Sequence, residues 1–348
     1  MLGVSCMPLF LLDNSANCPL VNIHGIIYIL WIMEGFMNTY TNGDYLDTLR
    51  RLAIISLFTD DELVDSFVLK GGNALNIAYG VSDRASMDID FSMKADFGID
   101  IKTVREKIEV ALNRTFSDEG FVPFDIKLTP TPGTVRKEYE SFWGGYTLEF
   151  KVISQDHFTE LNGDIESVRR HAVVFDNNQG KKMKIDISKY EYIDPKSEVE
   201  IDGYTVYVYT PLMVIYEKIR AVCQQVEYYS EHVVATNRKS RARDFFDIHS
   251  TLVKFPDIQL LQDENLDILI EMFKIKKVPL FLLERLNNDR NFHNTSFDSV
   301  KDTISPEYQN DLETFDYYFD YVLRIVEEII QRLKSLGLYE SDSKKIER

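Results

Sequence analysis

The sequence predicts an α/β (α+β) protein in which a mixed sheet with helices precedes a helical C-terminal domain. Short apolar segments bounded by glycine, proline or polar turns recur between residues 67 and 209, and this pattern indicates strands. After Thr210 the apolar residues recur three and four apart, which indicates helices. The 348 residues are enough for two domains with a sizeable core.

We divide the chain into a leader at residues 1–36, a mixed domain at 37–210 and a helical domain at 211–348. The leader combines apolar runs with Cys, Pro and Asn and shows little helical or strand period. We expect it to reflect an over-long gene start, with translation beginning at Met33 or Met37. The alternative is a genuine N-terminal segment packed on the domain, and an intact mass that includes Met1 would support that alternative.

The elements of the mixed domain follow from apolar spacing. Helical periodicity predicts helices over residues 45–58 and 101–116. Apolar or alternating runs predict strands over residues 67–69, 121–128, 146–153, 182–187, 199–201 and 204–209. Asp202-Gly203 is a typical turn between the last two strands.

The helical domain has recognisable helix signals. Thr210 is a good N-cap with Pro211 at the first helical position, and a further helix is expected over residues 241–252. A last helix is expected to start at Ser305-Pro306. It carries a heptad-like seam made of Leu312, Phe315, Phe319, Val322, Val326, Ile329 and Leu333. Packing inside the protein's own bundle is favoured over a dimerisation or partner surface.

A glycine pair marks the first candidate site. The apolar strand over residues 67–69 is followed by Lys70, Gly71, Gly72 and Asn73. Glycines let the backbone turn tightly and approach a ligand closely. A short helix expected over residues 73–79 would direct its free N–H groups at that ligand, which suits a phosphate.

Two acids follow on the next expected strand. Alternation places Asp88 and Asp90 on one face, while Met87, Ile89 and Phe91 take the other. Neighbouring carboxylates repel unless a cation lies between them, and hard divalent cations such as Mg²⁺ prefer oxygen ligands. A solvated strand edge is the alternative. Together, a phosphate cradle and an acidic pair indicate transfer of a phosphorus-containing group, although neither common glycine-rich nucleotide motif is present.

The arrangement resembles the nucleotidyltransferase superfamily, and within it the AbiEii/AbiGii toxin family. Four blocks within about residues 65 to 255 carry the resemblance, namely 70–75, 84–91, 216–221 and 241–248. It implies a nucleotidyltransferase fold and a nucleoside triphosphate (NTP) bound across Gly71 and Gly72. Asn73 departs from the superfamily pattern, which often has Ser or Thr there, so an amide or the backbone would replace a hydroxyl contact to phosphate.

The resemblance also implies roles for later residues. A third carboxylate usually helps to position metals and activate the attacking hydroxyl, and we assign it to Asp186, with Glu149 as the rival. Lys218 would bind the triphosphate, and Asp244 would orient Lys218 or a base. Surface or helix-capping roles are the alternatives for these residues. The predicted metal ligands are Asp88, Asp90 and Asp186; the predicted nucleotide contacts are Lys70, Gly71, Gly72, Asn73, Arg84, Ser86 and Lys218.

We therefore expect a Mg²⁺-dependent toxin of a toxin–antitoxin or phage-defence system. It would move a nucleotide from an NTP to an acceptor hydroxyl on RNA, with tRNA favoured, and a cognate antitoxin is a possible partner. Transfer to a protein hydroxyl and a non-catalytic nucleotide-binding module are the alternatives. A helix-turn-helix protein encoded just upstream would support the toxin assignment.

Charge, cysteine content and hydrophobicity indicate the cellular compartment and the kinds of partner that this chain can have. The formal net charge of −17 disfavours broad, non-specific nucleic-acid binding but leaves room for local basic patches at residues 181–184 and 238–243. Three cysteines (Cys6, Cys18 and Cys223) form no disulfide framework or CxxC metal motif, which fits a reducing cytoplasm. The apolar run at residues 26–33 is too short to span a bilayer, so no membrane association is expected.

Overall fold

The computed structural model describes residues 42–81, 88–175, 179–304 and 311–339. Residues Leu49–Arg348 form one compact unit, which holds all the candidate site residues, and Met1–Thr48 form a separate one. The predicted leader, the Met33 and Met37 starts, Arg84 and Ser86 lie outside the described residues. None of the helices in the described part is both long and apolar enough to cross a membrane.

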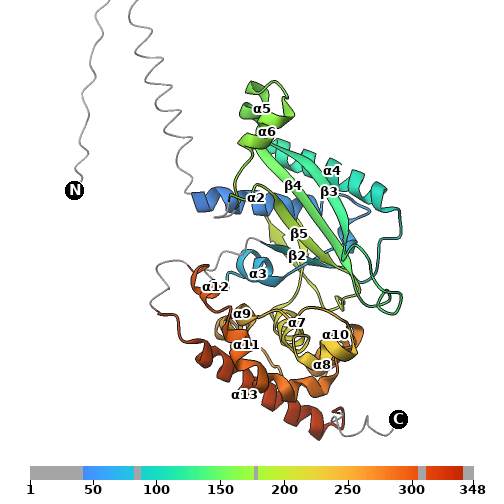
Figure 1. Ribbon diagram of the computed structural model, residues 1–348, viewed down its shortest axis with the longest axis vertical. Helices are drawn as coiled ribbons and strands as arrows, with labels where there is room; N and C mark the ends of the chain where they lie inside the picture. The colour runs from blue at the N-terminus through green and yellow to red at the C-terminus, as the bar shows by residue number, and fades with distance from the viewer. Residues whose placement is uncertain (1–41, 82–87, 176–178, 305–310, 340–348) are drawn as a thin grey trace, which may run out of the picture. The chain divides into compact units, whose positions relative to one another are not determined.

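A seven-stranded mixed sheet forms the first half of the larger unit (Figure 1). Its strand order is β3-β4-β5-β2-β1-β7-β6. The central strand β2 runs antiparallel to β1 and parallel to β5, and β1 runs parallel to β7. The strands are β1 (Val68–Lys70), β2 (Ile89–Ser92), β3 (Phe121–Thr131), β4 (Gly145–Ser154), β5 (Met183–Ser188), β6 (Ser197–Ile201) and β7 (Tyr204–Val208).

Helices surround the sheet and make up the second half of the unit. Those that precede or interrupt the strands are α2 (Asn42–Ser56), η1 (Val64–Ser66), α3 (Gly71–Asn73), η2 (Ala74–Ala78), α4 (Ile101–Asp118), α5 (Gln155–Glu160) and α6 (Ile165–His171). Those that follow are α7 (Pro211–Cys223), α8 (Glu227–His232), α9 (Ala242–Lys254), α10 (Asp263–Ile275), η3 (Leu280–Asp289), α11 (Arg290–Asn294), α12 (Asp298–Lys301) and α13 (Phe315–Ser335). The predicted fold class is confirmed.

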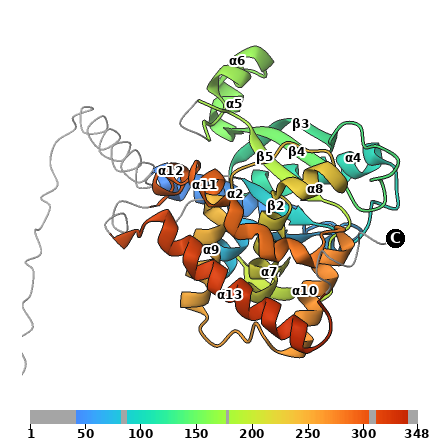
Figure 2. The same ribbon diagram turned by 60° about the horizontal axis from the view of Figure 1, so that its bottom comes forward.

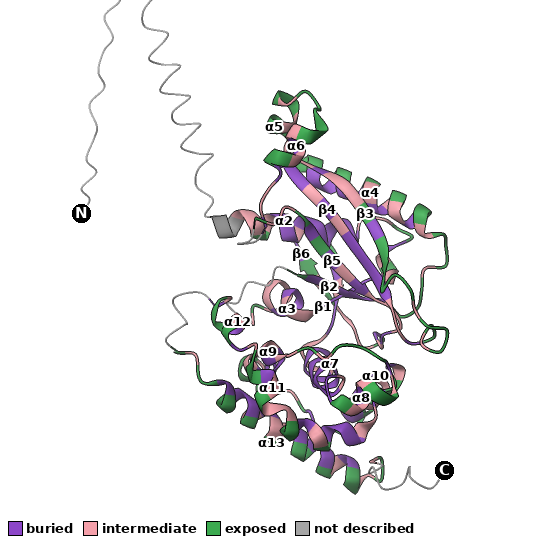
Figure 3. Ribbon diagram, viewed as in Figure 1, coloured by how far each residue is buried: buried purple, intermediate pink, exposed green. Residues whose placement is uncertain are grey.

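The core follows the alternation of the strands. In β5 the side chains of Met183, Ile185 and Ile187 are buried, while Lys184 is exposed and Asp186 half-buried. Helix α4 covers one face of the sheet, where the Phe116 ring meets the Phe150 ring edge-on at 5.7 Å between centroids. Figure 3 shows buried residues concentrated in the strands and the inward faces of the helices. Apolar alternation therefore decides which face of β5 is left for polar side chains.

The C-terminal helices pack around α7, which is buried along most of its length. Thr210 caps α7 as predicted, since its hydroxyl accepts a hydrogen bond from the Met213 N–H at 3.2 Å. Helix α13 lies beside α9 (Figure 2). The seam residues within α13 are buried in the same hydrophobic core as α7 and α9, while Leu312, which precedes the helix, is only partly buried. The seam thus serves the protein's own bundle.

The last helix begins later than predicted. The predicted start at Ser305-Pro306 lies within residues 305–310, which are outside the described chain. Helix α13 starts at Phe315, where the Thr314 hydroxyl accepts a hydrogen bond from the Tyr317 N–H at 3.4 Å. A Ser-Pro pair and a Thr three residues before Tyr317 are both acceptable helix starts, so local signals did not decide between them.

Candidate active site

The glycine bend lies directly at the end of β1. The first helical turn begins at Gly71, two residues earlier than the predicted start at Asn73, and continues as a single π-helical turn over Ala74–Ala78. Gly71 has a φ of +68°, and a Cβ placed there would lie 2.9 Å from Oδ2 of Asp90. Both the backbone conformation and the close approach of a carboxylate require glycine at this position.

Strand pairing assembles the acidic residues. Lys70 on β1 lies opposite Asp90 on β2, and Asp90 lies opposite Asp186 on β5. Asp88 lies in a bend just before β2 and is exposed. The prediction that it belongs to the strand is therefore wrong. Register therefore brings Asp90 and Asp186 onto neighbouring positions, with Asp88 beside them.

Asp90 lies in surroundings that disfavour its ionised form. The pKa of its carboxyl is raised to about 6, chiefly by burial, with Lys70 opposing the shift and the charges of Asp186, Glu217 and Asp88 adding to it. Asp186 accepts hydrogen bonds from the Thr147 hydroxyl at 2.8 Å and from Lys184 Nζ at 2.5 Å. The site concentrates negative charge that a cation would relieve.

Lys70 is held in place beside Asp90. It is buried, and its Nζ donates a hydrogen bond to the Ser188 hydroxyl at 3.2 Å. The Glu191 and Glu217 carboxylates lie 3.8 and 3.9 Å from the same nitrogen. Lys70 is therefore a fixed positive charge at the base of the site.

Lys218 is buried between two carboxylates of α9. Its Nζ lies 3.0 Å from Oδ1 of Asp244 and 2.7 Å from Oδ2 of Asp247. Burial opposes its charge, but the two carboxylates more than offset this and raise the pKa of Lys218. Lys218 is thus a fully charged, oriented ammonium and not an exposed surface lysine.

Asp244 lies between two cations, Lys218 and Arg241. Arg241 donates a hydrogen bond to its Oδ2 at 3.0 Å. Burial would raise the pKa of Asp244, but Lys218 and Arg241 together lower it to about 2. Asp244 is therefore ionised at neutral pH and is paired with the Lys218 ammonium.

These groups line one cavity of about 680 Å³. Eight of the residues predicted from sequence lie in its wall: Lys70, Gly71, Gly72, Asp88, Asp90, Asp186, Lys218 and Asp244. The remaining lining residues are Ser188, Glu217, Lys239, Ser240, Arg241, Ala242, Arg243, Asp247, Ser296 and Ser299. A cavity of this size with clustered acids and bases can hold a charged ligand together with a cation.

Two predicted residues lie outside the cavity wall. The Asn73 side chain is buried and donates a hydrogen bond to the Asp88 carbonyl at 2.6 Å, so it braces the acidic bend. Glu149, the rival third carboxylate, is paired with Lys182 at 2.9 Å. The structure therefore brings Asp186, and not Glu149, to the site.

Sequence reasoning missed several wall residues. Glu217 precedes Lys218 on α7, and Arg241 immediately precedes α9. Both belong to blocks already singled out, but spacing alone does not show that they face the cavity. Two arginines of the basic segment 238–243 are held in ion pairs. Arg238 is paired with Asp289 and Arg241 with Asp244, while Lys239 is exposed at the cavity.

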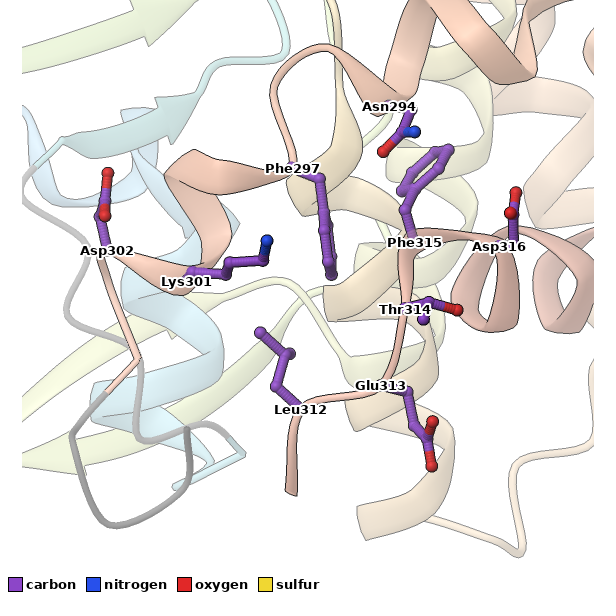
Figure 4. Close-up of a pocket in the computed structure, with 9 residues that line it drawn as sticks. All are labelled: Asn294, Phe297, Lys301, Asp302, Leu312, Glu313, Thr314, Phe315 and Asp316. Carbon is purple, nitrogen blue, oxygen red and sulfur yellow. The ribbon is translucent and has the colours of Figure 1, made fainter. Parts of the chain in front are cut away.

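A second pocket lies among α11, α12 and the start of α13, with a volume of about 540 Å³ (Figure 4). Phe297, Phe315 and Leu312 line it beside Lys301. None of the catalytic, nucleotide-binding or metal-binding residues predicted from sequence lies in its wall. Its lining residues come from before and after residues 305–310, and those six residues are outside the described chain. We therefore place the candidate site in the larger, charged cavity.

Comparison with known proteins identifies related sequences. The model of the family described as nucleotidyl transferase AbiEii toxin, type IV toxin–antitoxin system, matches residues 55–324. No curated protein matches the chain.

Solved structures with similarity to the chain are distant. JHP933 from Helicobacter pylori is 16% identical with a TM-score of 0.41, covering 84% of this chain and 94% of its own. MenT4, a nucleotidyltransferase toxin from Mycobacterium tuberculosis, is 12% identical with a TM-score of 0.29, covering 85% of this chain and 93% of its own. Both TM-scores lie below 0.5 and both identities below 20%.

Proposed function

The chain belongs to the AbiEii family of nucleotidyltransferase toxins, and from this premise we propose that it is a Mg²⁺-dependent enzyme that transfers a nucleotide to RNA. The observation that carries the proposal is the strand register that sets Asp90 between Lys70 and Asp186 at the wall of the charged cavity. The substrate would be an NTP, the acceptor a hydroxyl at an RNA end, with tRNA favoured, and a cognate antitoxin would restrain the toxin in the cytoplasm.

The residues present suit a hard divalent cation. Asp88, Asp90 and Asp186 supply carboxylate oxygens, and the absence of a Cβ at Gly71 leaves Oδ2 of Asp90 uncovered from that side. In the described part of the chain, no group of three or more His, Cys, Asp or Glu side chains is placed so that it could hold a metal ion by itself. Mg²⁺ commonly takes one or two carboxylates and completes its shell with water and substrate phosphates, so one or two of these three acids would suffice to hold it.

The proposed reaction is an in-line transfer. The acceptor hydroxyl oxygen forms a bond to the α-phosphorus, the bond between that phosphorus and the bridging α–β oxygen breaks, and pyrophosphate leaves. Asp186 would take the hydroxyl proton, and bound Mg²⁺ would neutralise charge on the phosphoryl oxygens. Lys218, oriented by Asp244 and Asp247, would bind the triphosphate as a compact positive charge.

The basic side of the cavity supports an RNA acceptor. Lys239 is exposed there, at the edge of the basic segment 238–243, which supports a polyanionic acceptor. The net charge of −17 supports the competing proposal of a protein hydroxyl as acceptor. The basic residues nearest the site favour RNA.

Label transfer tests the proposal. The protein is incubated with Mg²⁺, each α-phosphate-labelled NTP in turn and whole-cell extract, and the labelled product is treated with nuclease or protease. We expect nuclease-sensitive label, and a loss of about 100-fold or more for Asp90→Asn and Asp186→Asn. Glu149→Gln, a carboxylate change on the adjacent strand outside the cavity, is the matched control and should retain activity.

Other outcomes point elsewhere. Protease-sensitive label would replace the RNA acceptor with a protein one. Loss of activity in Glu149→Gln but not in Asp186→Asn would make Glu149 the third carboxylate. Growth inhibition that survives both Asp88→Ala and Asp90→Ala would separate toxicity from catalysis.

A further inference from the structure

Lys184 lies beside the site, where it pairs with Asp186 of the cavity wall, and the proposed reaction does not use it. It lies two residues before Asp186 on β5, so both side chains lie on the same face of the sheet. Its Nζ lies 2.5 Å from Oδ2 of Asp186. The Lys184 side chain is 47% exposed and that of Asp186 36%, so this ion pair lies at the solvent-facing edge of the site.

The pair belongs to a larger field of negative charge. Asp186 lies opposite Asp90 in the register of β5 and β2, and the charges of Asp88 and Asp90 also act on Lys184. Like charges at neighbouring positions on one face of a sheet repel. The Lys184 ammonium reduces this repulsion when no other cation is bound.

Lys70 and Lys184 differ in how they are held. Lys70 is buried and surrounded by Ser188, Glu191 and Glu217, so its position is determined by the fold. Lys184 reaches Asp186 on a long, solvent-exposed side chain, and such a side chain moves into water at little cost. It can therefore give up its place beside Asp186 without disturbing the sheet.

We propose that Lys184 is a built-in counter-cation that competes with the divalent metal for the Asp186 carboxylate and so weakens metal binding. The proposal rests on the proposed function, since it takes Asp186 as a metal ligand. In the metal-free protein the ammonium pairs with Asp186, and it withdraws into solvent when the metal binds. The affinity for the divalent ion is thereby lowered until a substrate that brings its own phosphate ligands is also present.

Calorimetric titration of the full chain with Mn²⁺ alone tests this. Lys184→Gln should lower the Kd for Mn²⁺ by about three- to tenfold, because the competing charge is gone. Lys184→Arg keeps the charge and should bind Mn²⁺ like the wild type. Lys182→Gln is the matched control. It removes a lysine from the same face, but one that pairs with Glu149 outside the cavity, and should change the Kd by less than about twofold.

Thermal melting gives a second readout. Without metal, Lys184→Gln should melt at a lower temperature than the wild type, because repulsion among the acids is no longer reduced. Saturating Mn²⁺ should close this gap. Lys182→Gln should show no such metal-dependent difference.

The outcomes separate the two proposals. If Mn²⁺ binds in an Asp186-dependent way but Lys184→Gln leaves the Kd unchanged or raises it, the competition by Lys184 is wrong and the metal site stands. If the wild type does not bind Mn²⁺, or Asp186→Asn binds it equally well, both the competition and the metal assignment to Asp186 fall.

Discussion

At Gly71 the backbone adopts a φ of +68°, and the direction in which a side chain would point is occupied by the Asp90 carboxylate. Two separate constraints therefore meet at one residue. The first is conformational, since L-residues adopt this φ at a cost of about 1–2 kcal/mol. The second is steric, and it acts on a carboxylate that the proposed reaction uses.

Alanine at two glycines separates these constraints. Gly71→Ala should lower nucleotidyl transfer at least about tenfold and destabilise the protein by about 1–2 kcal/mol, because Asp90 must shift and the backbone is strained. Gly80 has a comparable φ of +56°, and a Cβ placed there would have nothing within 4 Å. Gly80→Ala should therefore lower stability but keep activity. Label transfer and urea denaturation measure the two effects, and equal activity losses in both variants would contradict the steric argument.

At the scale of elements, α11 positions the start of α9. His293 of α11 is buried, and its Nδ1 accepts a hydrogen bond from the Arg241 N–H at 3.1 Å. The Ser240 hydroxyl donates to the His293 carbonyl at 2.7 Å. Because α9 carries Asp244 and Asp247, this contact fixes the carboxylates that hold Lys218.

The His293 contact predicts a pH dependence. Burial lowers the pKa of His293 to about 4, below the 6.5 of an unperturbed histidine. The unfolded chain therefore takes up the proton first, so this stabilisation is present above about pH 6.5 and is lost as the pH falls towards 4, up to about 3 kcal/mol. His293→Asn retains an acceptor but cannot be protonated in this range, so its free energy of unfolding should fall less between these pH values. Urea denaturation across this range measures it, and parallel wild-type and variant curves would refute the role of His293.

At the scale of the whole compact unit, a buried ion network joins the sheet to the helical region. Glu191, which follows β5, lies 3.3 Å from Arg220 of α7 and 3.2 Å from Lys276 at the end of α10. Burial would raise the pKa of Glu191, but Lys276, Arg220 and Lys70 lower it to about 2. One carboxylate thus balances cations from three separate parts of the fold, one of them Lys70 in the site.

Removing this carboxylate should be costly. Glu191→Gln leaves buried cations without their counter-charge and should destabilise the protein by about 3–5 kcal/mol. Asp194→Asn, which breaks the exposed Lys94–Asp194 pair, is the control and should cost less than about 1 kcal/mol. Urea denaturation compares the two, and a loss of less than about 1 kcal/mol for Glu191→Gln would show that the network does not stabilise the unit.

The same network crosses the predicted domain boundary near residue 210. The predicted change from strands to helices there is confirmed, since β7 ends at Val208 and α7 begins at Pro211. Yet Tyr209, Val68 and Phe142 share one hydrophobic core with the C-terminal helices. A change in local period marks where secondary structure changes, but it does not report whether the two halves share a core.

The sequence by itself determined the local features of this protein. Strand alternation predicted the polar face of β5 with Asp186, helix signals predicted the Thr210 cap, and the glycine pair with Asp88 and Asp90 predicted the acidic side of the cavity. These are short-range properties, since backbone sterics and the side-chain period act over a few residues.

Tertiary structure decided the rest. It placed Asp186, and not Glu149, in the cavity wall and bonded Asn73 to the Asp88 carbonyl. It also paired Asp247 with Lys218 and Lys184 with Asp186. The choice of carboxylate follows from strand order and register, and the pairing of α7 with α9 joins residues some 29 positions apart. No local pattern encodes such contacts, because they arise only when distant elements pack on one core.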